Sequence, residues 1–359
     1  MRLVEVEIKP QQNLWTLFGS DWPAVYNAPY NKSFRDLRPD PHKICAGDRI
    51  YKQICDEDIV HGDGRTAFIV TNGFMGDDIA TTAVANYFKS HNFKVIYMTH
   101  KIWSPLFGSL PIIDEVADRD RAVIAEKYKP NDIVVCPFFH NAELQSEGYA
   151  VLSSAVRSRE EWAYGARGRT ASAKLLLDGL GIDPTYISHE TFISFNKEAT
   201  EFGPKDAGIV VGSKDVPKRR LHYSAMDSIY ALLQEFGWNP VIICNDSESA
   251  KFKNRRCFEC RFFDPANLNR CVNVMNDLGI LFCPNSGLMH VRAYFKKPMI
   301  VPLDVGTVYT SGLTDYISYC GLFGIDQQAS SSIFANSDGM LSARFSKKLG
   351  AILEYYADS

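Results

Sequence analysis

The chain has 359 residues, 46% of them hydrophobic and 23% charged, and its formal net charge is −3 at pH 7. This composition is that of a globular protein, and the length suits two α/β domains of ordinary size. The small negative charge excludes an overall electrostatic attraction to nucleic acid or to an anionic membrane, but it does not exclude a local basic patch.

The sequence carries no recognisable signal for secretion or membrane insertion. No apolar stretch approaches the length of about 18 residues that a spanning helix needs, and the first residues lack the apolar run of a signal peptide. The nine cysteines are an odd number and are scattered along the chain. We therefore expect a cytoplasmic protein with reduced thiols and no membrane span.

Residues 1–65 show no sustained helical period and contain several prolines and aromatic residues. We expect them to form an N-terminal extension on the surface of the first domain, and the sequence assigns them no function. Regular α/β structure is predicted to begin at residue 66.

The first predicted domain spans residues 66–202. Three short apolar runs in it are typical of buried strands: residues 66–72, 93–100 and 132–139. Residues 76–91 place apolar side chains at helical spacing, and residues 113–129 are predicted to be partly helical. The alternation of strand and helix predicts a parallel sheet with right-handed crossovers.

A polar stretch with a Gly203-Pro204 break predicts the domain boundary, and a second α/β series follows in residues 203–315. Its predicted strands are residues 207–213, 239–246, 280–285 and 298–304. Its predicted helices are residues 223–237, 267–279 and 286–296. We expect the C-terminal segment, residues 316–359, to contain a helix that packs back toward the first domain.

The turn that follows the strand predicted over residues 280–285 has the chemistry of a phosphate site. Asn285 and Ser286 are good helix N-cap residues, and Gly287 allows a ligand to approach the backbone. Free N–H groups and the helix dipole favour an anion there, and His290 adds a donor or a charge. A tightly packed Gly287 and a buried, satisfied His290 explain the same residues equally well.

A second strand–loop–helix turn lies at residues 71–88. Gly73 and Gly76 free the backbone, and the pair Asp77 and Asp78 follows in the first turn of the predicted helix, where the dipole favours carboxylates. One of the two could act as a catalytic base facing an interdomain cleft, although ordinary N-terminal helix carboxylates are the more common case. The loop lacks the GxGxxG pattern of dinucleotide-binding proteins.

A basic loop follows the first strand of the second half. Ser213 ends that strand, and Lys218 and Arg220 lie among the cations that precede the next helix. Such a loop suits a diphosphate, although a solvated charge run is the more common explanation. Lys101 and His140 also follow strand ends and are candidates for acceptor binding, with plain loop residues as an equal alternative.

Together these segments resemble the heptosyltransferase family of GT-B glycosyltransferases, glycosyltransferase family 9. The resemblance rests on the Gly-Asp loop, on the basic loop of the second half, and on the Ser-Gly-Leu-x-His turn that precedes Lys-Pro and a strand. It covers residues 66 to about 305. It implies two Rossmann-like domains facing a cleft. It also implies sugar transfer from a nucleotide-diphosphate donor, typically ADP-heptose, with inversion and without a metal or a cofactor.

The resemblance implies roles for the residues that match the family pattern. Asp77 corresponds to the proposed general base, and Lys218 corresponds to the lysine that contacts the donor phosphate. The diphosphate-binding turn corresponds to Ser286, Gly287, Leu288 and His290. Further substrate-binding candidates are Gly76, Asp78, Lys101, His140, Ser213, Arg220 and Asn285.

Three departures from the family pattern concern the donor, and one is Asp78, a second carboxylate beside Asp77. Asn285 stands where the family usually has aspartate, and Arg220 stands where it usually has an aromatic residue. Two alternatives stay open: a GT-B enzyme that glycosylates a modified nucleobase in DNA, and a glycosyltransferase-like binding protein without catalysis. The expected partners are a nucleotide-sugar donor and a saccharide, lipid-saccharide or other hydroxyl acceptor, with nucleic acid less favoured.

Four cysteines raise the question of a metal site: Cys257, Cys260, Cys271 and Cys283. The CxxC spacing of the first two suits one half of a zinc site. The other two fall in a predicted helix and a predicted buried strand, and neither belongs to a second CxxC. The pattern favours reduced cysteines over zinc.

Overall fold

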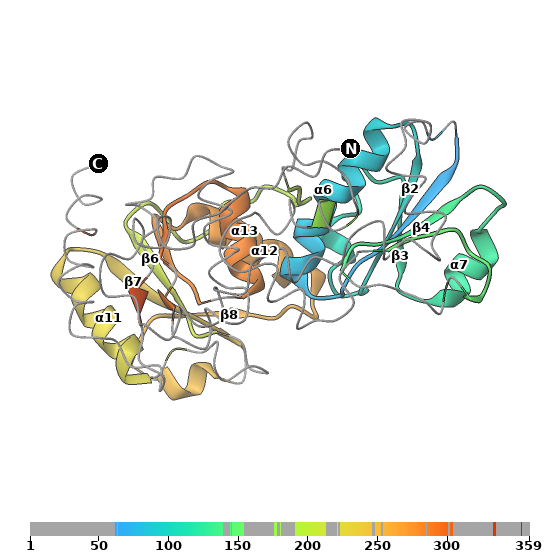
Figure 1. Ribbon diagram of the computed structural model, residues 1–359. Helices are drawn as coiled ribbons and strands as arrows, with labels where there is room; N and C mark the ends of the chain where they lie inside the picture. The colour runs from blue at the N-terminus through green and yellow to red at the C-terminus, as the bar shows by residue number, and fades with distance from the viewer. Residues whose placement is uncertain are drawn as a thin grey trace, which may run out of the picture. The chain divides into compact units, whose positions relative to one another are not determined.

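The computed structural model describes two compact units, Met1–Phe192 and Ile193–Ser359 (Figure 1). The described residues are 62, 64–138, 144, 146–153, 176, 177, 180, 191–212, 221, 223–245, 248–252, 254–284, 286–300, 302, 303, 333, 334 and 353. The predicted N-terminal extension therefore lies almost wholly outside the described residues.

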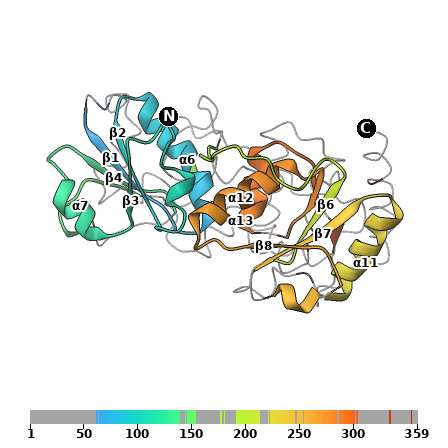
Figure 2. The ribbon, with the colours of Figure 1, turned by 180° about the vertical axis from the view of Figure 1, so that it is seen from behind.

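The first unit contains a parallel sheet in the order β3-β2-β1-β4-β5. Figure 2 labels its strands β1 to β4. Its strands are β1 (Thr66–Val70), β2 (Lys94–Thr99), β3 (Glu115–Asp118), β4 (Ile133–Cys136) and β5 (Val151–Ser153). The central strand β1 pairs with β2 and β4, so that Phe68 lies opposite Ile96 on one side and Val134 on the other. All three side chains are buried, as expected for a strand covered on both faces. The predicted parallel sheet is confirmed.

Among the described residues of this unit, the sheet is accompanied by α6 (Met75–Ser90), α7 (Arg121–Lys127) and a short 3₁₀ turn, η5 (Ser104–Leu106). Helix α6 packs on β1 and β2, and Ile79 and Ala83, one helical turn apart, are among its buried residues.

Residues 113–129 are partly helical, as predicted, but they also contain a strand that was not predicted. The chain first forms strand β3, in which Val116 lies opposite Tyr97 of β2. Asp120 then accepts a hydrogen bond from the Ala122 N–H at 2.9 Å and starts α7. An aspartate N-cap stops a helix from extending backward, and this explains the late start.

The second unit repeats the arrangement with the order β10-β9-β6-β7-β8, again all parallel. Its strands are β6 (Asp206–Val210), β7 (Asn239–Asn245), β8 (Cys257–Cys260), β9 (Ile280–Phe282) and β10 (Met299–Ile300). The strand predicted over residues 298–304 is divided into β10 and a second short strand, β11 (Pro302–Leu303). Strand β11 pairs with β12 (Ile333–Phe334) in a separate two-stranded sheet. Read outward from their first strands, the two five-stranded sheets have the same order, which is the Rossmann pattern.

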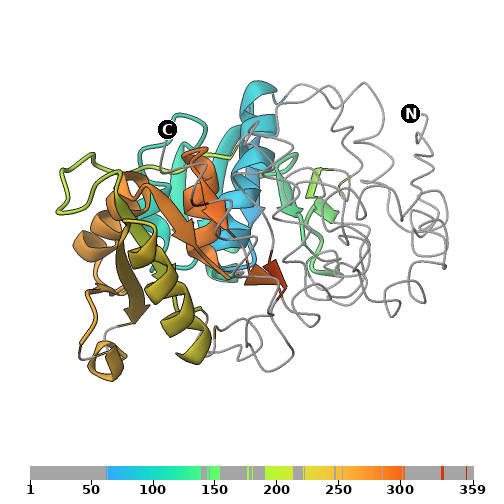
Figure 3. The same ribbon diagram turned by 90° about the vertical axis from the view of Figure 1, so that its left-hand side faces the viewer.

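The described residues of the second unit include the helices α11 (Tyr223–Glu235), α12 (Pro265–Asp277) and α13 (Gly287–Tyr294) and a 3₁₀ turn, η7 (Ser249–Phe252). Figure 3 turns this unit toward the viewer, with α11 in yellow against the sheet. Ile209, Ile242, Leu233 and Phe282 form the centre of one core cluster. Leu353 of the C-terminal segment is buried in the same cluster, so at this residue the segment packs on the second unit.

The chain divides earlier than the break expected at residues 202 and 203. Residues that follow Phe192 already bind helix α12 of the second unit. The Asn269 side chain accepts from the Asn196 N–H at 2.8 Å, and the Asn273 side chain accepts from the Glu198 N–H at 3.0 Å. Because Asn269 and Asn273 are four residues apart on one helix face, both bind the extended segment at residues 196–198, which we call the strap.

Candidate functional site

The carboxyl end of β1 is the natural place for a ligand in the first unit. The chain leaves β1 for β2 and β3 on one side and later crosses to β4 on the other, so strand order reverses at β1. Open α/β sheets bind ligands outside the carboxyl ends of the strands at this switch point. The turn Thr71–Phe74 joins β1 to α6 there.

This turn is held by contacts from three directions. Trp103 donates from its indole N–H to the Gly73 carbonyl at 3.0 Å, and Arg119 donates to the Asn72 carbonyl at 2.9 Å. The Gly73 N–H donates to a carboxylate oxygen of Asp78 at 2.8 Å. Gly73 has φ of 82°, and a Cβ there would lie 2.3 Å from the Arg119 guanidinium. Backbone conformation therefore favours glycine at this position, whereas the flexible Arg119 side chain could move to make space.

Asp77 presents a partly accessible carboxylate on the first turn of α6. One of its oxygens accepts a hydrogen bond from the Asn72 side-chain amide at 2.7 Å. The Asp77 side chain is partly exposed, whereas Gly76 beside it is buried. An oriented carboxylate with solvent access is the geometry that a general base needs.

Asp78, by contrast, is fully buried. Its carboxylate accepts from the Gly73 N–H and from the Thr99 hydroxyl, and its backbone carbonyl accepts from the Tyr97 hydroxyl. Burial raises the pKa of Asp78 to about 6, against the hydrogen bonds from Thr99 and Gly73, which lower it. The predicted contact of Asp78 with substrate is therefore replaced by a positioning role: it ties the β1–α6 turn to the end of β2.

The carboxyl edge of this sheet also carries exposed groups. Lys101 follows β2 and is exposed, and within the described ranges it forms no ion pair. Phe74, between the turn and α6, has 58% of its surface exposed. Both lie at the same edge as Asp77, because β1 and β2 are neighbouring parallel strands.

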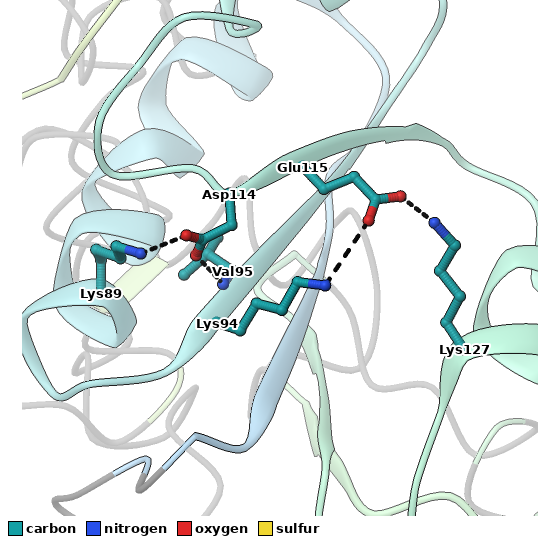
Figure 4. A network of polar contacts seen from close by, with 6 residues as sticks. All are labelled: Lys89, Lys94, Val95, Asp114, Glu115 and Lys127. Atoms are coloured by element: carbon teal, nitrogen blue, oxygen red, sulfur yellow. Dashed lines mark hydrogen bonds and ion pairs between the residues drawn. The ribbon is translucent and has the colours of Figure 1, made fainter.

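The amino edge of the same sheet is different (Figure 4). Lys89 pairs with Asp114 at 2.6 Å, and Glu115 pairs with both Lys94 and Lys127. Burial alone would raise the pKa of Asp114, but hydrogen bonds from Lys89 and from the Val95 N–H lower it below the ordinary value. Charges at the amino edge therefore fasten helices to strands, which leaves the carboxyl edge as the candidate for ligand chemistry.

In the second unit, α13 begins at the carboxyl end of β9. Ser286 is its N-cap, and both Ser286 and Gly287 are partly exposed. The Ser286 hydroxyl makes no capping hydrogen bond and lies 3.2 Å from the Cys283 sulfur. Burial raises the pKa of the Cys283 thiol to about 12, so this sulfur stays protonated. The start of α13 thus offers a hydroxyl and backbone N–H groups to a ligand.

Two predicted members of this site lie inside the protein. Leu288 and His290 are 5% and 4% exposed. Their burial matches the packing interpretation of this segment better than direct contact with a ligand in this conformation. Strand β6 neighbours β9, so the loops that follow these two strands start at one edge of the sheet. The remaining candidates are outside the described residues: His140, Ser213, Lys218, Arg220 and Asn285.

Arg292 is a buried, hydrogen-bonded arginine that the sequence analysis did not identify. Its side chain is fully buried, and its guanidinium donates to the carbonyls of Met275, Leu278, Gly279 and Pro298 at 2.6 to 3.1 Å. Burial lowers the pKa of Arg292 to about 9. Met275 and Leu278 lie at the C-terminal end of α12, where a helix dipole favours a cation. Arg292 therefore locks α13 onto α12 and onto the entry to β9.

Within the described residues, no group of three or more His, Cys, Asp or Glu side chains is arranged to hold a metal ion. Cys257, Cys260, Cys271 and Cys283 are all free thiols. Burial raises the pKa of Cys257, Cys260 and Cys283, which further disfavours thiolate ligands. No helix in the described ranges combines the length and the apolar composition that crossing a bilayer requires.

Comparison with known proteins identifies the fold. No family profile matches the chain, and no curated protein sequence matches it. The structure of the glycosyl transferase family 9 from Veillonella parvula is similar at TM-score 0.52 and 15% identity, over 82% of this chain and 98% of that one. E. coli heptosyltransferase WaaC with ADP is similar at 0.52 and 10% identity, over 81% and 99%.

E. coli ADP-heptose LPS heptosyltransferase II is similar at TM-score 0.50 and 11% identity, over 81% of this chain and 99% of that one. These likenesses extend over nearly the whole length of each neighbour. The chain therefore has the two-domain, Rossmann-like GT-B fold of family 9 glycosyltransferases, and the expected fold class is confirmed.

Proposed function

We propose that this protein is a glycosyltransferase that moves a sugar from a nucleotide-diphosphate donor to an acceptor hydroxyl, with inversion and without a metal. The observation that carries the proposal is the placement of Asp77. It is an accessible carboxylate at the switch point of the first sheet, oriented by Asn72 on a turn that Asp78 holds in place.

In the proposed reaction, Asp77 accepts the proton of the acceptor hydroxyl. The acceptor oxygen forms a bond to the anomeric carbon as the bond from that carbon to the diphosphate oxygen breaks. The nucleoside diphosphate leaves with the electron pair. Attack from the face opposite the leaving group inverts the anomeric centre.

The second unit supplies the donor site in this proposal. The Ser286 hydroxyl and the free N–H groups of α13 stabilise the negative charge that grows on the diphosphate. Lys218 and Arg220, outside the described residues, are proposed to add positive charge. Arg292 contributes by holding α13 in place. The N–H groups of α13 are then already oriented toward the diphosphate and need not rearrange during the reaction. The structure of WaaC contains ADP, and this favours adenine as the base of the nucleotide-sugar donor.

A nucleotide-binding measurement tests the proposal. Melting temperatures are recorded with ADP, UDP, GDP and dTDP for the wild type, for Ser286→Ala and for the control Ser228→Ala, at an exposed position of α11. At least one nucleotide should raise the melting temperature by mass action. Ser286→Ala should weaken its affinity about tenfold, as expected for a hydrogen bond to a charged group. If none of the four nucleotides shifts the wild type, the donor proposal fails.

A further inference from the structure

Phe74 breaks the usual rule that large apolar side chains are covered. Its ring is 58% exposed, and among the described residues only Tyr223 at 39% and Phe263 at 86% share this property. Phe74 is the only one of the three in the first unit, and it lies at the edge of the sheet that carries Asp77. Ligand sites are lined mainly by apolar and aromatic side chains, so this ring is a candidate for ligand contact.

The side chain of Phe74 takes no part in starting the helix. It is the N-cap of α6, with φ of −102° and ψ of 135°, and no side chain caps the helix there. Ser, Thr, Asp and Asn are the residues that stabilise an N-cap, because their side-chain oxygens accept from the free N–H groups. A phenylalanine does not, so local stability does not explain the residue. Departures of this kind are expected at functional positions.

The ring and the candidate base belong to the same helix start. Phe74 is the N-cap and Asp77 is three residues later, so both residues lie at the first turn of α6. The Asp78 N–H donates to the Phe74 carbonyl at 2.8 Å, which fixes the backbone of the ring. Trp103 holds the preceding carbonyl of Gly73. A ring on such a rigid turn is preorganised for a ligand whose hydroxyl faces Asp77.

We propose that Phe74 is a stacking platform for a pyranose ring of the acceptor and selects saccharide acceptors over other hydroxyl compounds. A pyranose has a face of C–H groups that is apolar and weakly positive, which suits the negative face of an aromatic ring. The hydroxyls project from its rim, so one of them reaches Asp77 while the C–H face covers Phe74. This inference rests on the proposed role of the Asp77 turn as the acceptor site.

Saturation-transfer NMR with methyl pyranosides tests the platform without donor or turnover. The probes are the methyl glycosides of glucose, galactose and mannose, with N-acetylserinamide as a hydroxyl compound that lacks a pyranose. The wild type should transfer saturation to the C–H protons of at least one pyranoside. Phe74→Ala should lower that transfer about fivefold, the loss expected for one aromatic contact, and Phe74→Tyr should retain it. Phe263→Ala is the matched control and should behave as the wild type.

Three results would overturn the inference. The first is the lack of transfer to any pyranoside in the wild type, and the second is equal transfer in the wild type and Phe74→Ala. The third is a large fall in the melting temperature of Phe74→Ala, which would mean that the ring packs against the protein. Because these probes need no nucleotide, a failure of donor binding would count against the proposed function and leave the platform standing.

Discussion

The two units share a strand order, but a buried negative side chain holds the start of α6 in the first unit, and a buried positive side chain holds α13 in the second. In the first unit the buried carboxylate of Asp78 holds the turn before α6. In the second unit the buried guanidinium of Arg292 holds α13 through four carbonyls. The carboxylate binds two donors that an amide could also satisfy, whereas no neutral side chain replaces the guanidinium. The same architecture therefore contains one replaceable and one irreplaceable buried charge.

Neutralising Arg292 should have the largest effect on stability. Arg292→Met keeps much of the side-chain volume but leaves carbonyls of Met275, Leu278, Gly279 and Pro298 without their donor. We expect a loss of about 3–5 kcal/mol in the free energy of unfolding. Urea unfolding followed by Trp238, which is buried in the second unit, measures it.

Arg270→Met is the control for this substitution. Arg270 is half exposed and pairs with Glu201 at 2.6 Å, so its loss should cost under about 1 kcal/mol. Equal effects of the two substitutions would contradict the assigned role of Arg292.

Neutralising Asp78 should have a smaller effect that depends on pH. The folded-state pKa of about 6 lies above the ordinary value of 3.8, so the folded protein holds this proton more tightly. The stability gained in this way is fully present below about pH 4 and is lost as the pH rises through about 6. The whole change is at most about 3 kcal/mol.

Asp78→Asn removes this titration while keeping one acceptor for Gly73 and one donor for Thr99. Its free energy of unfolding at pH 7 should match or exceed that of the wild type, and the difference should reverse or vanish near pH 4. Chemical unfolding at pH 4, 5, 6 and 7 makes the comparison. A wild-type stability that rises from pH 4 to 6 while that of Asp78→Asn stays level would contradict the assignment.

The strap at the division between the units should give the smallest effect. Asn273 is 1% exposed, donates to the carbonyls of Asn196 and Asn269, and accepts from Glu198. Asn273→Ala should cost about 1–2 kcal/mol and increase proteolytic cleavage after Phe192. Asn276→Ala, on the same helix, serves as the control. Unchanged cleavage in Asn273→Ala would show that the strap does not depend on this side chain.

The sequence predicted the parallel sheets well because buried strands have a local signature. The apolar runs at 66–72 and 239–246 became β1 and β7 with small changes at their ends. Strand β8 was missed, since Cys257–Cys260 is short, contains a glutamate and matched a metal motif instead. Its strand character comes from pairing with β7, which lies outside any local window.

The candidate site was less predictable because burial decides it. Asp77 and Asp78 are adjacent and chemically alike, but Thr99 and Tyr97 from β2 enclose only Asp78. The sequence separation between α6 and β2 hides this difference. The role of Arg292 has no local sequence signal, because its four carbonyl partners come from other segments of the second unit. Pattern located the turns, and tertiary contacts divided their residues into accessible and structural ones.

The most direct test of the central claim is turnover of a nucleotide sugar by Asp77→Asn. The substrate is a nucleotide sugar that contains the nucleoside diphosphate with the highest affinity. The measured quantity is the rate at which that nucleoside diphosphate is released. We predict a loss of roughly 10²- to 10⁴-fold in kcat with an unchanged affinity for the nucleotide. Glu126→Gln, an exposed carboxylate of α7, should stay within about twofold of the wild type. Equal turnover by Asp77→Asn and the wild type would contradict the account.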